Sequence, residues 1–347
     1  MCFLRACALC FLTLVVPGTA FADLDTTVPK RGVVRTVTEA CRPAAVAAPK
    51  GVLGISDPHA ADAAVVNLIA QTGVKWVRAE FHWSKIEPMA GEGYRWDNYD
   101  RMVQAYQQRG IRVLGILTYI PDTQPRDWAL IDVAYRRFAT AVVKRYAVRG
   151  VHHWEVFNEP NLPGYGWLTR SQNVKANLSA YTLLLARTNQ AVRRNDPKGI
   201  VVLGGLASDQ KRGITAEQTM QVIYDLGGKN CFDVMAFHPY GYQNRFPEAR
   251  ARVEAILAAG KDGGKPIWFN EYGWTEQAEM DIKINPDSGS NPMLAALKQR
   301  TSADALFWFA AKDYSAKLGT PEFGLATFDL RKRPSFETFR HFVTSIK

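Results

Sequence analysis

Short apolar strings alternate with longer amphipathic stretches from about residue 51 to the end of the chain. The strings are rich in β-branched and aromatic residues and are too short for most helices, so they predict buried β-strands. Near-continuous apolar runs of this kind are typical of parallel sheets, whose two faces are both covered. The predicted strands are Gly51–Ser56, Lys75–Trp83, Ile111–Tyr119, His152–Glu159, Ile200–Ala207, Phe232–Tyr240, Pro266–Trp274 and Ala305–Ala311.

The stretches between the strings carry apolar residues at intervals of three and four, which predicts amphipathic helices. The clearest examples are Asp97–Arg109, Asp132–Val148 and Leu178–Asn195, and a last helix is predicted over Pro334–Ile346. Glycine commonly stops a helix. Four glycines stand just before predicted strands: Gly73, Gly110, Gly150 and Gly199.

Eight strands alternating with helices are the number that a (β/α)8 barrel requires, so we expect an α/β fold with a single TIM barrel over residues 51–347. A doubly wound parallel sheet is the alternative. Such a sheet usually carries a glycine-rich phosphate loop near its N-terminus, and Gly51 and Gly54 alone are too sparse for one. The sequence shows no repeat of solenoid length and no linker that divides it.

The N-terminus predicts a cleaved export signal over residues 1–22. Arg5 gives a weakly positive start, an apolar core runs over Ala8–Val16, and Ala20-Phe21-Ala22 has the small residues that signal peptidase reads. A buried N-terminal helix is the alternative. Residues 23–50 have no periodicity and contain three prolines, which predicts an extended segment. We expect a periplasmic or secreted protein without a stable membrane insertion, because the apolar core is too short to span a bilayer.

Charge narrows the choice of partners. Predicted cleavage shortens the chain from 347 to 325 residues and lowers its formal net charge from +10 to +9. A basic surface favours an anionic polymer or the cell envelope. The lysines and arginines are dispersed, without a dense basic run, and export also argues against a nucleic-acid partner.

The predicted cleavage removes three of the five cysteines and leaves Cys41 and Cys231. Cys231 precedes the sixth predicted strand, at the N-terminal face of the barrel, and Cys41 lies in the segment that must cross that face. Export permits oxidation, so we expect a disulfide that ties the N-terminal segment to the barrel. Two free thiols, one of them buried, are the alternative.

Two predicted strands bring a glutamate to their C-terminal ends, where the active sites of barrels lie: Glu159 in Asn158-Glu159-Pro160, and Glu271. Glycosidic cleavage needs two carboxyl groups, one protonated and one ionised. Asn-Glu-Pro alone is also an ordinary polar strand end, so the pair of glutamates carries this prediction. The adjacent His152 and His153 lack the spacing of a zinc site, and we expect neither a metal nor a cofactor.

The block Trp154-Glu-Val-Phe-Asn-Glu-Pro-Asn161, with Glu271 on a later strand, resembles the clan A glycoside hydrolases. Within the clan it is most similar to family 39 and to bacterial endoglycosidases made alongside exopolysaccharide systems. The resemblance extends over nearly the whole mature chain. Its other blocks are Val77–Trp83, Ile86–Pro88, Val202–Leu206, His238–Tyr240 and Phe323–Leu325.

The resemblance implies a role for each matching residue. Glu159 corresponds to the general acid/base and Glu271 to the nucleophile. Asn158 corresponds to the residue that hydrogen-bonds the sugar hydroxyl next to the anomeric carbon. The other matches are Arg78, which holds the nucleophile ionised, Tyr240, which hydrogen-bonds it, His238 beside them, and Trp308, which floors the sugar subsite.

Several of these residues also have a structural interpretation. Arg78 is compatible with a surface ion pair, and His238 with a buried structural histidine. Trp308 stands between two phenylalanines, so core packing competes with a subsite role. His82 and Trp83 end the second strand, and we expect both to line the cleft.

Together these features predict a secreted, monomeric, retaining glycoside hydrolase that cleaves O-glycosidic bonds by double displacement and acts internally on a bacterial exopolysaccharide. An exo-acting β-xylosidase-like glycosidase is the first alternative. A non-catalytic polysaccharide-binding barrel is the second, although such a barrel would usually have lost one carboxylate or its supporting arginine. The residue spacing does not select a sugar.

Overall fold

The computed structural model describes residues 37–124, 128–162, 174–208, 214–242, 245–275, 292–315 and 322–346. The predicted signal segment and the first part of the predicted extended segment lie outside these residues. The strands are β1 (Val52–Ser56), β2 (Trp76–His82), β3 (Arg112–Thr118), β4 (His153–Val156), β5 (Ile200–Leu203), β6 (Leu206–Ala207), β7 (Met235–His238), β8 (Ile267–Tyr272) and β9 (Ala305–Phe309).

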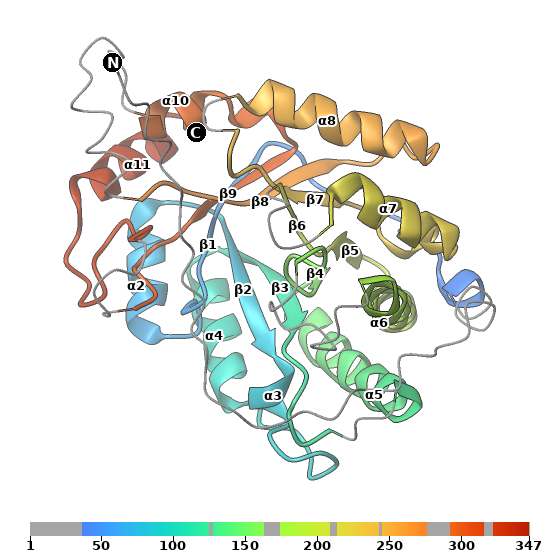
Figure 1. Ribbon diagram of the computed structural model, residues 1–347. Helices are drawn as coiled ribbons and strands as arrows, with labels where there is room; N and C mark the ends of the chain where they lie inside the picture. Colours follow the sequence, from blue (N-terminus) through green and yellow to red (C-terminus); the bar gives the residue numbers. More distant parts are fainter. Residues whose placement is uncertain are drawn as a thin grey trace, which may run out of the picture.

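All nine strands belong to one curled parallel sheet, in the order β5-β4-β3-β2-β1-β9-β8-β7-β6. β5 and β6 are two halves of one barrel strand, separated by Gly204 and Gly205. β6 pairs with β7, and the N–H of Leu203 in β5 donates to the carbonyl of Val234, just before β7. The sheet therefore closes into a barrel with eight strand positions, which confirms the predicted fold (Figure 1).

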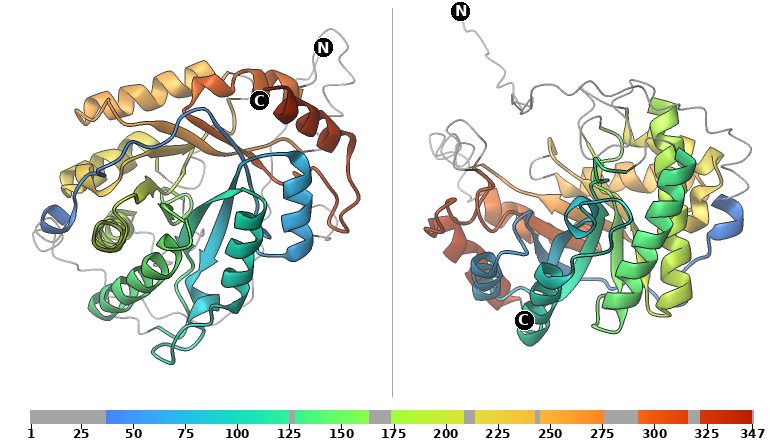
Figure 2. Two further views of the ribbon diagram at one scale, coloured as in Figure 1. Left: turned by 180° about the vertical axis from the view of Figure 1, so that it is seen from behind. Right: turned by 90° about the horizontal axis from the view of Figure 1, so that it is seen from below.

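Helices surround the strands, as the two views of Figure 2 show. They agree with the predicted helices to within a few residues at their ends; for example, α2 stops at Gly73, whose φ of 84° lies in the left-handed region. The helices are α2 (Ala63–Thr72), α3 (Trp83–Ile86), α4 (Asp97–Gln108), α5 (Trp128–Ala147), α6 (Val174–Asn195), α7 (Ala216–Asp225), α8 (Phe246–Ala259), α10 (Pro292–Lys298) and α11 (Pro334–Ser345), with 3₁₀ turns η1 (Gly228–Cys231) and η3 (Arg300–Ser302).

The core has two parts. The larger one lies between the strands and the surrounding helices. The smaller one fills the barrel interior near the strand starts, with Trp76, Trp268 and Phe307 as its largest members. Gly54 of β1 makes room for Phe307, since a Cβ there would lie 2.7 Å from the ring. The apolar filling leaves the C-terminal half of the interior to polar side chains.

The chain before β1 crosses the N-terminal end of the barrel, as the left view of Figure 2 shows. A disulfide joins Cys41 to Cys231, with the two Cα atoms 4.7 Å apart, which confirms the predicted bridge. The N–H of Ala44 donates to Asp233 at 2.8 Å, and Ala48 packs against the interior cluster. The barrel floor is thus closed at the end opposite the strand termini that carry the glutamates.

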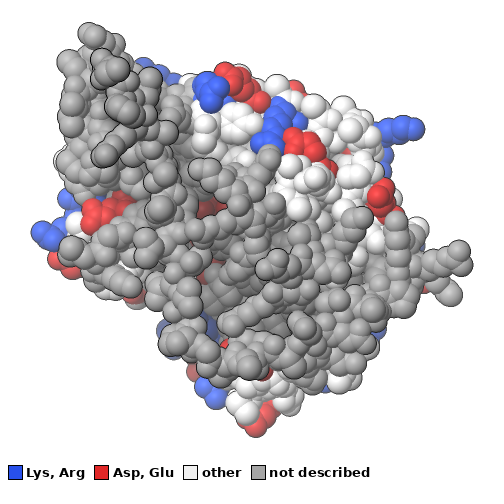
Figure 3. Space-filling view, viewed as in Figure 1, with Lys and Arg blue, Asp and Glu red and all other residues white. Residues whose placement is uncertain are grey.

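Among the described residues, no helix is both long enough and apolar enough to cross a membrane. On the face shown in Figure 3, the basic and acidic side chains of the described part are interspersed, and no large basic patch appears among them.

Candidate active site

The inner face of β2 changes from apolar to polar along the strand. Trp76 belongs to the interior cluster, whereas Arg78, Glu80 and His82 follow at alternate positions. Side chains two residues apart share one face of a strand, so these three point into the barrel toward its C-terminal end. The residues between them pack in the outer core: Val77, Ala79 and Phe81.

Arg78 is the centre of the site, and each of its five N–H groups has a separate acceptor. Nε and Nη2 bind the two oxygens of Glu155 at 2.7 and 2.8 Å. Nη1 donates to Ser56 at 2.9 Å and to Glu271 at 2.8 Å, and Nη2 donates to Asn158 at 2.6 Å. Burial acts to lower the pKa of Arg78, but Glu155 and Glu271 outweigh it and raise that pKa above its usual value. The surface ion pair considered for Arg78 is therefore wrong.

Glu271 reaches the inner face of β8 through an irregularity in the strand. Phe269 pairs with Leu306 and Tyr272 with Trp308, so β8 has one residue more than β9 between these pairs. Such a bulge re-aims side chains, and Asn270 and Glu271 both come to face the interior. Oε2 of Glu271 accepts from Arg78, and Oε1 accepts from the Tyr240 hydroxyl at 3.2 Å. Both contacts stabilise an ionised carboxylate.

Glu159 lies in the turn after β4, with a φ of 45°. Its N–H donates to the carbonyl of Gly205, and its Oε1 lies 3.0 Å from Nδ1 of His238. Burial raises the pKa of Glu159 above its usual value, and the negative charge of Glu271 adds to the rise, whereas His238 opposes it. Burial therefore favours the protonated form of this carboxyl group.

Asn158 and Tyr240 complete the contacts around the two glutamates. Asn158 is fixed by Arg78, and Tyr240 is held over Glu271. Burial, followed by the charge of Glu271, raises the pKa of Tyr240, so its hydroxyl stays a donor. Hydrogen bonds join Arg78, Asn158, Tyr240 and Glu271. Glu159 binds His238, and its backbone is linked through Gly205 to Glu155, the partner of Arg78. The structure thus brings these six predicted site residues together: Arg78, Asn158, Glu159, His238, Tyr240 and Glu271.

His82 lies at the rim beside this network. Its Nε2 atom is 2.5 Å from Oε2 of Glu80, and its ring stacks on Tyr119 with the centroids 4.3 Å apart. Both His82 and Glu80 keep about one sixth of their side-chain surface exposed, 16% and 15%. His82 thus lies beside the two glutamates, and its lining of a substrate cleft stays a prediction.

Trp83 does not line the cleft, and that prediction is wrong. Its side chain is fully buried, its ring stacks on Phe138 at 5.2 Å, and its Nε1 donates to Glu87 at 2.6 Å. β2 ends at His82, and α3 begins at Trp83. Because Trp83 belongs to a helix, the period-two alternation of the strand does not apply to it, and its side chain points into the outer core.

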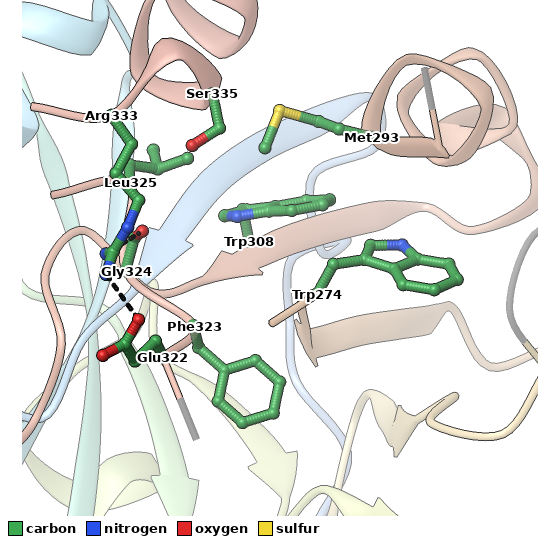
Figure 4. Close-up of a pocket in the computed structure, with 9 residues that line it drawn as sticks. All are labelled: Trp274, Met293, Trp308, Glu322, Phe323, Gly324, Leu325, Arg333 and Ser335. Atoms are coloured by element: carbon green, nitrogen blue, oxygen red, sulfur yellow. Dashed lines mark hydrogen bonds and ion pairs between the residues drawn. The ribbon is translucent and has the colours of Figure 1, made fainter. Parts of the chain in front are cut away.

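Trp308 also lies away from the two glutamates. It pairs with Ile55 and Tyr272, which belong to the outer core, and it packs against Phe339 of α11. Figure 4 shows Trp308 lining a hollow, and neither Glu159 nor Glu271 is among the residues that line it. The neighbouring Phe309 pairs with Ser56, a partner of Arg78, so Phe309 faces the site. The core interpretation of Trp308 fits the structure better than the subsite role.

Two acidic residues of the site escaped the sequence reasoning. Glu155 is fully buried and binds both Arg78 and the N–H of Gly205. Glu80 anchors His82. Each is a charged residue inside an apolar strand, two or four positions from an expected site residue. That position was an available signal, because an isolated charge in a buried strand requires a partner.

Comparison with known proteins agrees with this geometry. The sequence model of the cellulase family, glycosyl hydrolase family 5, matches residues 42–313. No curated protein sequence matches the chain.

Several solved glycosidases share the fold. A family 39 glycoside hydrolase from Bacteroides cellulosilyticus WH2 is 18% identical with a TM-score of 0.63, over 86% of this chain and 64% of that enzyme. A monomeric β-xylosidase from Caulobacter crescentus CB15 is 18% identical with a TM-score of 0.63, over 85% and 69%. A family 1 β-glucosidase from Thermotoga maritima is 12% identical with a TM-score of 0.61, over 86% and 99%.

The chain spans 64% of the length of the first of these enzymes, and identities this low show the fold alone. The family match covers most of the chain and agrees with the clan A resemblance of the sequence. With both glutamates and Arg78 assembled, a non-catalytic binding barrel has no support. The chain is a glycoside hydrolase of clan A and belongs to the cellulase family, glycosyl hydrolase family 5.

Proposed function

We propose that the enzyme is a retaining glycosidase in which Glu271 is the nucleophile and Glu159 the general acid/base. The contrast between the two carboxyl environments carries the proposal. Glu271 accepts from a guanidinium and a phenol, which favours its ionised form. Glu159 is buried, and its pKa is raised. Retention by double displacement needs this division between an ionised nucleophile and a protonated acid.

The first step forms a bond between an oxygen of Glu271 and the anomeric carbon. The bond from that carbon to the glycosidic oxygen breaks, and Glu159 gives its proton to the leaving oxygen. Arg78 and Tyr240 keep their contacts with the nucleophile before the attack. In the second step Glu159, now ionised, takes a proton from water, which attacks the anomeric carbon and releases Glu271. The sugar leaves with its original anomeric configuration.

Replacing the nucleophile tests this assignment directly. We expect Glu271→Ala to abolish hydrolysis of aryl glycosides with an unchanged fold by circular dichroism. Glu254→Ala is the matched control, because Glu254 is an exposed glutamate of α8. Added azide should restore turnover of Glu271→Ala and give a glycosyl azide of inverted configuration. Hydrolysis by Glu271→Ala at the rate of the control would overturn the assignment.

The acid/base has a different signature. With Glu159→Ala, we expect a loss of about 10²–10⁴-fold in kcat/KM for substrates with poor leaving groups. A dinitrophenyl leaving group needs no proton, so kcat/KM for such a glycoside should stay near the wild-type value while kcat falls. Equal losses for both kinds of substrate would contradict the role of Glu159.

For the substrate, we propose internal cleavage of a bacterial exopolysaccharide. The predicted export signal, the net charge of +10 and the sequence resemblance support this. The second candidate is an exo-acting β-xylosidase-like activity, which the likeness to the Caulobacter β-xylosidase favours. Product lengths over time on a polysaccharide panel and on xylo-oligosaccharides separate the two. Early products of mixed length indicate internal cleavage, and monosaccharide from the start indicates exo action.

Export is part of the same proposal. Cleavage after Ala22 would release a periplasmic or secreted enzyme whose remaining chain carries one barrel domain over residues 51–347. Mass spectrometry of the protein from its native compartment tests this. A mature N-terminus at Asp23 is expected, and an intact N-terminus in the cytoplasm would contradict it.

A further inference from the structure

His238 lies between Glu159 and a second buried side chain. Its Nδ1 atom is 3.0 Å from Oε1 of Glu159, and the residue is fully buried at the end of β7. Its other nitrogen, Nε2, is buried and has no hydrogen-bond partner among the described residues. Asn270 of β8 is fully buried too, and within the same part of the chain neither its Oδ1 nor its Nδ2 has a partner.

The ring and the amide both lie close to Gly205. A Cβ atom on Gly205 would lie 2.1 Å from Nε2 of His238 and 2.7 Å from Oδ1 of Asn270, so both side chains point at the same small volume. The glycine keeps this volume open. A half turn of the amide about its last side-chain bond exchanges Oδ1 with Nδ2 and turns a donor toward the ring. The two groups are not hydrogen-bonded as they stand, so a bond between them also needs a small approach of the two side chains.

An asparagine at this position needs a physical reason. A buried polar group without a partner is destabilising, and buried polar groups are normally hydrogen-bonded. Asn270 lies two residues after the interior residue Trp268, so it faces the barrel interior by the ordinary alternation of β8, and the extra residue of the strand turns Glu271 to the same side. An apolar residue here would avoid the cost but would offer nothing to the histidine ring.

We propose that Asn270 is a positioning residue that donates from Nδ2 to Nε2 of His238 and so keeps the ring proton on Nδ1. The inference rests on the proposed role of Glu159 as general acid/base. In a neutral imidazole one nitrogen donates and the other accepts, and the hydrogen bond of one sets the state of the other. With Nε2 accepting from Asn270, Nδ1 must donate to Oε1 of Glu159.

This donor determines where the acidic proton of Glu159 sits. Oε1 accepts from His238 in both protonation states, so the proton is held on Oε2. It passes from Oε2 to the glycosidic oxygen as that bond breaks, and Oε2 later takes a proton from the attacking water. The opposite tautomer would make Nδ1 an acceptor for the carboxyl O–H and draw the proton away from the substrate.

Other titratable groups face His238 and Glu159 from the neighbouring strands: Arg78 from β2, Glu155 from β4, Tyr240 after β7 and Glu271 from β8. These groups bind one another, with Arg78 between the two carboxylates and Tyr240 on Glu271. Among the described residues, Asn270 is the buried polar side chain without a partner that shares the volume beside Gly205 with Nε2.

Nitrogen NMR of the histidine rings tests the proposal without any substrate. In ¹⁵N-labelled full-length enzyme, assigned with a His238→Gln variant, we expect His238 to be protonated on Nδ1 and bare on Nε2. Protonation on Nε2 in the wild-type enzyme would overturn the proposal, and this measurement does not depend on the folding of any variant at Asn270.

Two substitutions at Asn270 should move the tautomer in different ways. Asn270→Asp offers only an acceptor to Nε2, so we expect Nε2 to become protonated. Asn270→Leu offers neither donor nor acceptor, so we expect a mixture of tautomers. Asn98→Asp, at an exposed position of α4, is the matched control and should leave His238 unchanged. A wild-type pattern in both Asn270 variants would also overturn the proposal.

Kinetics separate this role from a merely structural one. For Asn270→Leu we expect kcat/KM to fall roughly tenfold to a hundredfold with a poor leaving group and little with dinitrophenol, because part of the acid contribution is lost. Equal losses on both substrates would contradict it. Full activity of Glu271→Ala would contradict the proposed function. The NMR measurement of the His238 tautomer would still test the role of Asn270 in that case.

Discussion

Arg78 lies between two carboxylates, and removing one of them leaves a cation with too few partners. Glu155 is fully buried and binds Arg78 through both oxygens. Breaking a buried ion pair by removing one member costs about 3–5 kcal/mol, because the remaining charge stays desolvated. We therefore expect Glu155→Gln to lower the free energy of unfolding by an amount in this range, measured with urea at neutral pH.

The chain offers a matched control on its surface. Glu217 binds Arg252 through both oxygens at 2.7 and 2.8 Å, with 48% of its side chain exposed. An exposed pair contributes about 0–1 kcal/mol, so Glu217→Gln should change the unfolding free energy little. Similar losses of unfolding free energy in the two variants would show that burial does not make the Glu155–Arg78 pair more important for stability than an exposed pair.

The raised pKa of Glu159 also has a consequence for stability. Between the ordinary pKa of glutamate and the higher folded value, the native state binds more protons than the unfolded state, so stability falls as pH rises. Glu159→Gln removes this cost and keeps an oxygen that accepts from His238. We expect the variant to be more stable than wild type at about pH 8, with the difference closing toward about pH 4. Unfolding curves at both pH values measure this, and a less stable variant at pH 8 would refute it.

The run Phe307-Trp308-Phe309 shows where sequence patterning stops being informative. A strand buried on both faces has no alternation of apolar and polar residues, so the sequence does not show which residues face inward. A shift of one residue exchanges the two faces. Pairing with β1 resolves this, since Ser56 lies opposite Phe309 and Ile55 opposite Trp308. Strand existence was predictable from apolar strings and glycine stops, but orientation within such a strand was not.

Two substitutions in β9 should therefore behave differently. Trp308→Ala removes a buried ring and should cost about 3–5 kcal/mol of unfolding free energy with little effect on KM. Phe309→Ala removes a partly exposed ring that faces the site. It should lower kcat/KM by up to about tenfold, since an aromatic contact is worth about 1 kcal/mol. Urea unfolding and steady-state kinetics on both variants test the pair, and the reverse pattern would restore the subsite role of Trp308.

The bulge in β8 and the break between β5 and β6 explain most of what the sequence left undetermined at the site. Both act through the backbone. The extra residue at Asn270 and Glu271 brings two adjacent side chains to one face, which a period of two does not allow. Gly205 opens the space beside His238. The two glutamates were predictable from their positions at strand ends, whereas Glu155 and Asn270 required the three-dimensional neighbours that neutralise or bind them.

The molecule as a whole is divided between a catalytic end and a structural end. The disulfide lies at the structural end and joins residues 190 positions apart. Closing so long a loop is worth about 5 kcal/mol in the chain-entropy model. We expect Cys41→Ser/Cys231→Ser to lose stability of this order, seen as a lower Tm, with kcat/KM unchanged at a temperature where it stays folded. Reduction of the wild-type disulfide should lower the Tm to that of the double variant. If the double variant and the reduced enzyme both kept the Tm of the oxidised wild-type enzyme, the bridge would be contradicted.

The same bridge makes part of the chain a closed covalent ring. The ring consists of the backbone from Cys41 to Cys231 and the bond between the two sulfurs, and it contains Arg78 and Glu159. Glu271 lies in the tail, the part of the chain after the ring. A protease that cuts once inside the ring leaves both products attached to each other, but a cut in the tail releases a fragment. On a gel without reductant, single cuts between residues 41 and 231 therefore leave the mass unchanged. The strand that carries Glu271 can be lost to one cleavage, and the strand that carries Glu159 cannot.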